Sequence, residues 1–131
     1  MNIGRIKLGA AALGAMKRTS SQAINYANER EQFGRQISKY GAIRYKLAEQ
    51  AIKNYSLESA LYRTGLNIDQ ATEELLESGM EEAEAKLKGV EEFAVEAAIL
   101  KVYGSEALDY VVDEGVQVYG GMGYSADAPM D

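Results

Sequence analysis

The chain opens with apolar residues at intervals of three and four, the spacing that places side chains on one face of a helix. It predicts one long helix from Ile3 to about Glu29. Gly9 and Gly14 interrupt this helix, each at a cost of about 1 kcal/mol relative to alanine. Small residues at these positions indicate close approach by another backbone or by a ligand. The apolar stripe consists of Ile3, Ile6, Ala10, Leu13, Ile24 and Ala27.

A second helical segment begins at Ser38, which is a suitable N-cap, and has apolar residues at every fourth position. Gly65 predicts its C-terminal end, and residues 32–37 are left as the preceding loop. Residues 69–79 predict a short helix that ends in its own glycine. The acidic residues of this helix and of its charged continuation, residues 80–89, are interpreted as a solvated face. The periodic positions of the second segment are Ile43, Leu47, Ala51 and Tyr55.

From Val90 the three-and-four spacing predicts a third long helix that ends near Tyr119, and no strand signal occurs anywhere. Three helices with short loops predict an all-α, up-down antiparallel bundle, one domain over residues 1–131. Helices of this length are more often found in four-helix bundles, and "SADAPMD" ends as a loop. We therefore expect an incomplete four-helix bundle that is a fragment of a longer protein.

Composition narrows the possible chemistry. The chain has 131 residues and a formal charge of −6, which argues against a non-specific nucleic-acid surface. It has no cysteine and no histidine, which excludes disulfides, Cys/His metal sites and histidine catalysis within the chain, and we expect no metal. Because there is no run of about eighteen apolar residues and no signal peptide, we expect a cytoplasmic protein without a membrane span.

Two clusters carry candidate chemistry. The first is Arg30, Gln32 and Phe33, where a guanidinium fork, an amide and an aromatic ring suit a nucleotide-like ligand. The alternative is that Arg30 compensates the helix dipole while Phe33 is buried under the loop. The second is "QVYGGMGY", Gln117 to Tyr124, whose glycines permit close approach by a ligand or simply end a helix. These glycines follow a helix rather than a strand, so a Rossmann fingerprint is rejected.

Taken together, the clusters resemble the two signatures of the acyl-CoA dehydrogenase family. The first signature is matched by "RIKLGAAALGAMKRTSSQAINYANEREQFGRQI", and the second by "GVQVYGGMGYSADAPMD". The resemblance covers nearly the whole chain. Within the family, "QISKYGAIRYKLAEQ" and "GGMGY" are most similar to the very-long-chain branch.

The resemblance implies an architecture and a cofactor. Family members have a C-terminal four-helix bundle that builds the core of the oligomer, and their cofactor is FAD, whose adenosine pyrophosphate is held partly by the neighbouring subunit. We therefore expect a homo-oligomer. The implied cofactor-binding residues are Arg30, Gln32, Phe33, Gln117, Gly120 and Gly121.

The implied substrate is an acyl-CoA thioester, and Asn2 and Arg5 occupy the family's acyl-CoA-binding stretch. Asn2 replaces a common acidic residue. Tyr40 and Gly41 stand where several members have His-Gln, so the resemblance assigns no side-chain contact to FAD to these two positions.

The implied reaction is α,β-dehydrogenation, with electron-transfer flavoprotein as acceptor, and it needs a carboxylate base. Neither family position for that base is acidic here: the "EGT" motif is absent, and the position before Arg5 is Gly4. We expect the base beyond Asp131, no catalytic residue in this chain, and no activity of the chain alone. Asp127 and Asp131 are interpreted as solvated. The alternatives are an acyl-CoA oxidase-like flavoprotein domain and a non-enzymatic helical self-association module.

Overall fold

The computed structural model describes residues 1–128 and confirms the all-α prediction, with one small hairpin added. Asp131, which was expected to be solvated, lies outside the described residues, while Asp127 is exposed as expected. The elements in chain order are α1 (Asn2–Glu29), β1 (Glu31–Gln32), β2 (Arg35–Gln36), η1 (Ile37–Lys39), α2 (Gly41–Glu77), α3 (Glu82–Glu92), α4 (Ala94–Tyr119) and η2 (Gly120–Tyr124).

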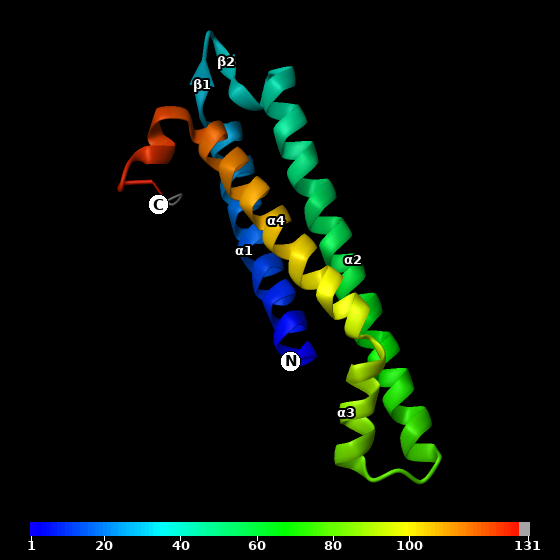
Figure 1. Cartoon of the computed structure of the whole chain (residues 1–131). Helices are drawn as coiled ribbons and strands as arrows, with labels where there is room; N and C mark the ends of the chain where they lie inside the picture. Colours follow the sequence, from blue (N-terminus) through cyan, green and yellow to red (C-terminus); the bar gives the residue numbers. More distant parts are fainter. Residues whose placement is uncertain (129–131) are drawn as a thin grey trace.

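The long helices α1, α2 and α4 lie side by side, with α2 antiparallel to the other two (Figure 1). The short helix α3 packs against the C-terminal part of α2, and the hairpin β1–β2 stands at the opposite end of the bundle. Met16, Leu57, Leu100 and Val111 form the centre of the core between the three long helices. No helix within residues 1–128 is both long enough and apolar enough to cross a lipid bilayer.

Helices α1 and α4 approach closely at a pair of glycines. A Cβ atom added to Gly104 would lie 3.2 Å from the Cα atom of Gly9, and one added to Gly9 would lie 3.2 Å from the carbonyl oxygen of Leu100. The predicted close approach of another backbone is therefore confirmed at Gly9. Gly14 faces open space, with no atom within 4 Å of an added Cβ.

Helix α2 begins later than predicted, because Ser38 does not cap it, and ends later than predicted, because Gly65 does not end it. It begins after Tyr40, while Ser38 lies inside the preceding 3-10 turn. It continues through Gly65 to Glu77 because packing outweighs the local cost of one glycine. The buried positions recur every seven residues on both sides of Gly65, as Gln50, Leu57, Thr64 and Ala71.

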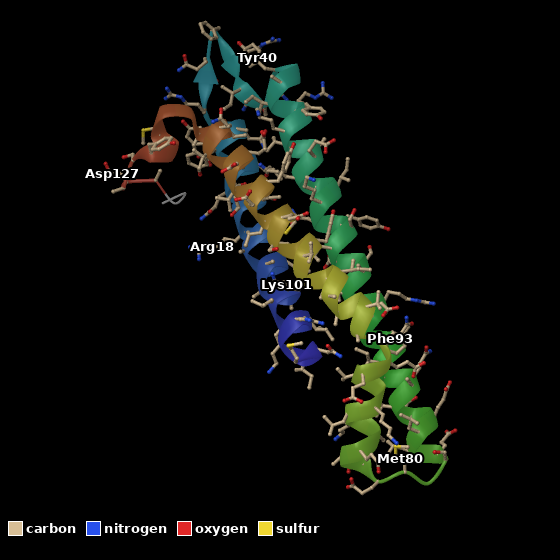
Figure 2. All side chains as sticks on the ribbon, viewed as in Figure 1. Arg18, Tyr40, Met80, Phe93, Lys101 and Asp127 are labelled. Carbon is tan, nitrogen blue, oxygen red and sulfur yellow. The ribbon has the colours of Figure 1, made fainter. Side chains whose placement is uncertain are left out.

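The predicted third helix is broken at Phe93, which separates α3 from α4 (Figure 2). Helix α3 starts at Glu82, because the carboxylate of Glu81 accepts hydrogen bonds from the backbone N–H groups of Ala83 and Glu84. It packs on α2 at Gly89, where an added Cβ would lie 2.3 Å from the hydroxyl oxygen of Thr72. The charged segment is thus a helix with a packed face.

Candidate functional site

Both sequence clusters line one groove, although 90 residues separate Arg30 from Gly120 along the chain. The groove has a volume of about 540 Å³ and lies where the C-terminal ends of α1 and α4 meet the hairpin (Figure 1). Its walls are formed by Tyr26, Arg30, Gln32, Phe33, Ile37, Tyr40, Ile43, Val118, Tyr119, Gly120, Gly121 and Met122. The fold therefore brings together five of the six residues predicted to bind the cofactor.

Two backbone hydrogen bonds fix the position of Arg30 in the wall of the groove. It ends α1 in an extended conformation, its N–H group donates to the carbonyl of Tyr26 at 2.8 Å, and its own carbonyl accepts from Ile37 at 2.8 Å. The side chain is exposed, and its guanidinium forms no ion pair within residues 1–128. An anion in the groove would meet this guanidinium without displacing a carboxylate.

Gln32 and Phe33 belong to a β-hairpin, so the prediction of a strand-free loop over residues 32–37 was wrong. Strand β1 pairs with β2 through Glu31 opposite Gln36 and Gln32 opposite Arg35. Phe33 and Gly34 form the turn with φ angles of 53° and 81°, the conformation that matches the twist of a two-residue hairpin. Glycine supplies this conformation easily, whereas it is strained for phenylalanine.

The ring of Phe33 is 93% exposed at the tip of this hairpin. The alternative interpretation, in which Phe33 is buried under the loop, is therefore wrong. A large apolar ring held in solvent on a strained backbone is poorly explained by the stability of this chain alone. Its position on the groove wall makes it available to cover a flat ligand.

Tyr40, the residue directly before α2, contacts the hairpin (Figure 2). Its hydroxyl donates a hydrogen bond to the carbonyl of Gln32 at 2.9 Å, and the guanidinium of Arg35 lies 4.1 Å from the centre of its ring. The family resemblance assigned no FAD contact to Tyr40. The structure places this side chain in the wall of the groove.

Two stacked tyrosines join the helix ends beneath the groove. The ring centroids of Tyr26 and Tyr119 lie 4.0 Å apart, at an interplanar angle of 14°. The hydroxyl of Tyr119 donates to the carbonyl of Gln22 at 3.4 Å. Burial, together with the neighbouring Tyr26 and Glu29, raises the pKa of Tyr119 above its usual value of 10.0, so its hydroxyl stays protonated at neutral pH.

The glycines after α4 have separate roles. Gly120 adopts φ 59° and ψ −134°, a backbone conformation almost restricted to glycine. Gly123 is required for packing, since an added Cβ would lie 2.7 Å from the carbonyl oxygen of Val116. Gly121 has nothing within 4 Å of an added Cβ and lines the groove, so it leaves room for a ligand.

Gln117 is the predicted cofactor residue that the structure does not bring into the groove wall. Its side chain is exposed on α4 and is absent from the groove lining. Its backbone carbonyl accepts the N–H of Gly120, so within these residues Gln117 contributes to the helix end through its main chain.

Asn2 and Arg5 lie at the opposite end of α1. The guanidinium of Arg5 lies 3.5 Å from the side-chain oxygen of Asn2, and Asn2 lines a small cavity of about 230 Å³ together with residues of α3. At a rise of about 1.5 Å per residue, Arg5 and Arg30 are separated by about 37 Å along the helix. The predicted substrate residues are therefore not part of the groove.

The wall of the groove is mainly aromatic and aliphatic, with Arg30 as its charged group and no carboxylate among its described residues. Such a wall can hold a flat ring and place an anion beside it. Seven of its residues were not among those predicted to bind the cofactor, although the last three lie within the second sequence cluster: Tyr26, Ile37, Tyr40, Ile43, Val118, Tyr119 and Met122. The helical spacing contains a signal for Tyr26, because a residue four positions before Arg30 lies on the same face.

A comparison with known proteins agrees with the family resemblance of the two sequence clusters. Residues 1–131, the whole chain, match the family described as acyl-CoA dehydrogenase, C-terminal domain. The chain belongs to the acyl-CoA dehydrogenase family. The family prediction made from the two signatures is confirmed, as is the helical fold that it implied.

Relatives within the acyl-CoA dehydrogenase family are similar along almost all of this chain. A probable acyl-CoA dehydrogenase of Bacillus subtilis (strain 168) is 43% identical over 128 residues, which cover 95% of this chain and 21% of the relative. The mitochondrial very long-chain specific acyl-CoA dehydrogenase of Rattus norvegicus is 38% identical over 124 residues, covering 95% and 16%. The chain thus spans about a fifth of the length of these relatives.

A crystal structure of an acyl-CoA dehydrogenase complexed with FAD, from Bacillus anthracis, has the same fold as this chain. The TM-score is 0.92 at 41% sequence identity, over 98% of this chain and 22% of that chain. The arrangement of the helices is therefore the one that acyl-CoA dehydrogenases use in their C-terminal domain.

Proposed function

We propose that this chain acts as the C-terminal helical domain of an FAD-dependent acyl-CoA dehydrogenase, and that its groove holds the adenosine pyrophosphate end of FAD. The observation that carries the proposal is the meeting of Arg30 and Gln32 with Gly120 and Gly121 in one groove. The FAD-bound relative from Bacillus anthracis, which has the same fold, supports the choice of cofactor.

The residues present fit this part of FAD in charge and in shape. The guanidinium of Arg30, which forms no ion pair within residues 1–128, offers paired N–H donors to a pyrophosphate. The open space beside Gly121 lets a phosphate approach the backbone, where a side chain would hold it away. The rings of Phe33 and Tyr40 supply flat apolar surface for the remainder of the ligand.

FAD held by Arg30, Gln32, Gly120 and Gly121 would supply the oxidant for the β hydrogen of the acyl thioester. The residues of this chain bind and orient the cofactor. The chain has no "EGT" motif and carries Gly4 at the other family position for the base, so we propose that the base for the α proton is supplied from outside this chain. On this proposal the chain alone is inactive.

We propose that Asn2 and Arg5 contact the CoA part of the substrate. Because about 37 Å of helix separates Arg5 from Arg30, one chain serves substrate at one end and cofactor at the other. This separation supports a homo-oligomer in which the groove of one subunit holds the FAD of its neighbour. Gln117 would reach that FAD through its exposed side chain.

The remaining proposals concern the whole enzyme of which this chain would be the C-terminal domain, here called the parent enzyme. The identity to the very long-chain specific enzyme of Rattus norvegicus supports placing the parent in the very-long-chain branch. Its electron acceptor is proposed to be electron-transfer flavoprotein, and its location to be the cytoplasm.

A domain exchange tests the proposed function. This chain replaces the matching segment of the Bacillus subtilis relative, to which it is 43% identical. We expect a yellow protein whose flavin absorbance is bleached by acyl-CoA. A folded exchange protein that copurified without flavin would contradict the proposal.

Arg30→Ala within the exchange protein tests the groove itself. Loss of a charge-assisted pair worth about 1.5–3 kcal/mol should weaken FAD binding about ten- to a hundredfold. The matched control is Arg18→Ala, which removes an exposed arginine from the middle of the same helix. Equal FAD affinity in both variants would show that Arg30 does not bind FAD.

A further inference from the structure

The β1–β2 hairpin, which carries Gln32 and Phe33 into the groove wall, has little to stabilise it from within. Its strands have two residues each, and a two-stranded hairpin is only marginally stable in water on its own. The backbone of Phe33 is strained at φ 53°, and its ring is 93% exposed, so packing within the chain does little to offset that strain. Contacts from outside the hairpin are therefore needed to keep it in the conformation that builds the groove.

The base of the hairpin is anchored in the bundle. The N–H group of Ile37 donates to the carbonyl of Arg30 at 2.8 Å, and the side chain of Ile37 packs against the small buried cluster between the C-terminal parts of α1 and α4. These contacts fix the two ends of the hairpin. They involve neither Gln32 nor Arg35, the residue that faces Gln32 across the strands.

Tyr40 connects both strands to the bundle (Figure 2). Its hydroxyl donates to the carbonyl of Gln32 in β1 at 2.9 Å, and the guanidinium of Arg35 in β2 lies 4.1 Å from the centre of its ring. The backbone of Tyr40 is itself bonded on both sides. Its N–H donates to the carbonyl of Ile37 at 3.1 Å, and its carbonyl accepts from the N–H of Arg44 in α2 at 3.0 Å.

We propose that Tyr40 is a positioning residue for the groove. Its hydroxyl and its ring tie the two strands to the start of α2, and this keeps Gln32 in the groove wall before any ligand arrives. A ligand that meets an ordered wall does not lose affinity to the ordering of that wall. The effect on FAD rests on the proposed function, whereas the ordering of the hairpin does not.

The two parts of the Tyr40 side chain can be separated by substitution. The ring lines the groove, whereas the hydroxyl bonds to the backbone of the hairpin. Tyr40→Phe therefore keeps the surface that a ligand would touch and removes the hydrogen bond to Gln32. Arg35 is not among the residues that line the groove, so a substitution there reaches the groove through Tyr40 and the paired strand.

The ordering of the hairpin can be measured on the chain itself. The sequence contains no tryptophan, so Phe33→Trp introduces a single fluorescent reporter at the hairpin tip, where the exposed ring of Phe33 loses little packing. Adding Tyr40→Phe should lower the residual fluorescence anisotropy of the reporter on the nanosecond timescale, with unchanged helical circular dichroism. Tyr45→Phe is the matched control, because Tyr45 is 64% exposed and does not line the groove.

The role of the Arg35 cation is tested with the same reporter. Arg35→Gln removes the charge over the Tyr40 ring and should also lower the residual anisotropy. Arg35→Lys keeps a cation that can lie over the ring, and it should recover most of the lost anisotropy. Arg18→Gln removes an exposed arginine from α1 and should change nothing. Equal mobility in the glutamine and lysine variants of Arg35 would show that the cation does not contribute.

The consequence for the cofactor is measured in the exchange protein with Phe33 intact. Tyr40→Phe should weaken FAD binding about two- to tenfold, the effect of one hydrogen bond, and Tyr45→Phe should not. An unchanged anisotropy in Tyr40→Phe would overturn the inference, as would a mobile hairpin that binds FAD with the original affinity. A folded exchange protein without flavin would instead contradict the proposed function, and the anisotropy would still decide whether Tyr40 orders the hairpin.

Discussion

The ring of Tyr26 stacks on the ring of Tyr119 across the C-terminal ends of α1 and α4, with 4.0 Å between the centroids. Arg30 lies one helical turn beyond the first ring, and Gly120 directly follows the second. The stack therefore sets the distance between the two halves of the groove. Its hydroxyl contacts are long, at 3.4 and 3.5 Å, so most of its strength comes from the rings.

Removing one ring should loosen this junction. Tyr119→Ala is expected to lower the free energy of unfolding by about 2–4 kcal/mol, because it loses both apolar burial and the aromatic pair. Tyr119→Phe keeps the ring and should cost less than about 1 kcal/mol. Urea unfolding followed by circular dichroism measures both, and equal losses in the two variants would show that the hydroxyl matters more than the stack.

Tyr119 should also make the stability of the protein depend on pH at alkaline values. The pKa values of Tyr119 and Tyr110 are both raised by burial above the usual 10.0, so the folded state holds these protons more tightly than the unfolded state. Their contribution to stability is therefore complete below about pH 10 and declines as the pH rises above it. The urea midpoint should fall as the pH rises above 10, and by less in Tyr119→Phe.

The crossing of α1 and α4 should not accept a methyl group. Gly104→Ala would place a Cβ 3.2 Å from the Cα of Gly9, and the resulting displacement should cost about 1–3 kcal/mol of stability. Gly14→Ala, on the same helix as Gly9 but in open space, should instead stabilise the protein by up to about 1 kcal/mol. Thermal unfolding of the two variants should shift in opposite directions.

Two adjacent glycines should separate folding from ligand binding. Gly120→Ala is strained by its positive φ of 59° and should cost about 1–3 kcal/mol of stability. Gly121→Ala meets no atom of the other described residues within 4 Å, apart from its chain neighbours, and should change stability by less than about 0.5 kcal/mol. In the exchange protein, however, Gly121→Ala should lower FAD affinity, because its methyl group enters the groove. FAD titration of the purified apoprotein would detect this.

The buried amide of Gln50 should be dispensable for stability. It is fully buried, and neither its oxygen nor its nitrogen has a hydrogen-bond partner within the described part of the chain. Gln50→Leu should raise the free energy of unfolding by about 1–3 kcal/mol, since an unsatisfied polar group is replaced by an apolar one of similar size. Leu57→Ala, one buried position further along α2, should cost about 2–5 kcal/mol. Destabilisation by Gln50→Leu would mean that the amide is satisfied in solution.

Prediction from the sequence found the end of α1 at Glu29 but not its packed face. Only Leu13 and Ala27 of the predicted apolar stripe are buried, whereas Ile3, Ala10 and Ile24 are exposed, because α4 packs on the small residues Gly9 and Ala12 instead. The same reasoning failed at Gly65, where a helix-ending residue lies in the middle of α2 because residues on both sides of it pack into the bundle. It also failed at the hairpin, since a strand of two residues is too short to leave a periodic signal.

The sequence by itself determined the helical class of this protein, its family and five groove residues, since these depend on residue types at fixed spacings along the chain. Only the tertiary structure decided that Tyr26, Tyr40 and Tyr119 complete the groove, that Gln117 points outside it, and that Arg5 lies far from Arg30. The physical reason is that a groove is defined by which helix faces remain uncovered. Covering of faces depends on contacts between residues distant in sequence, such as Gly9 with Gly104.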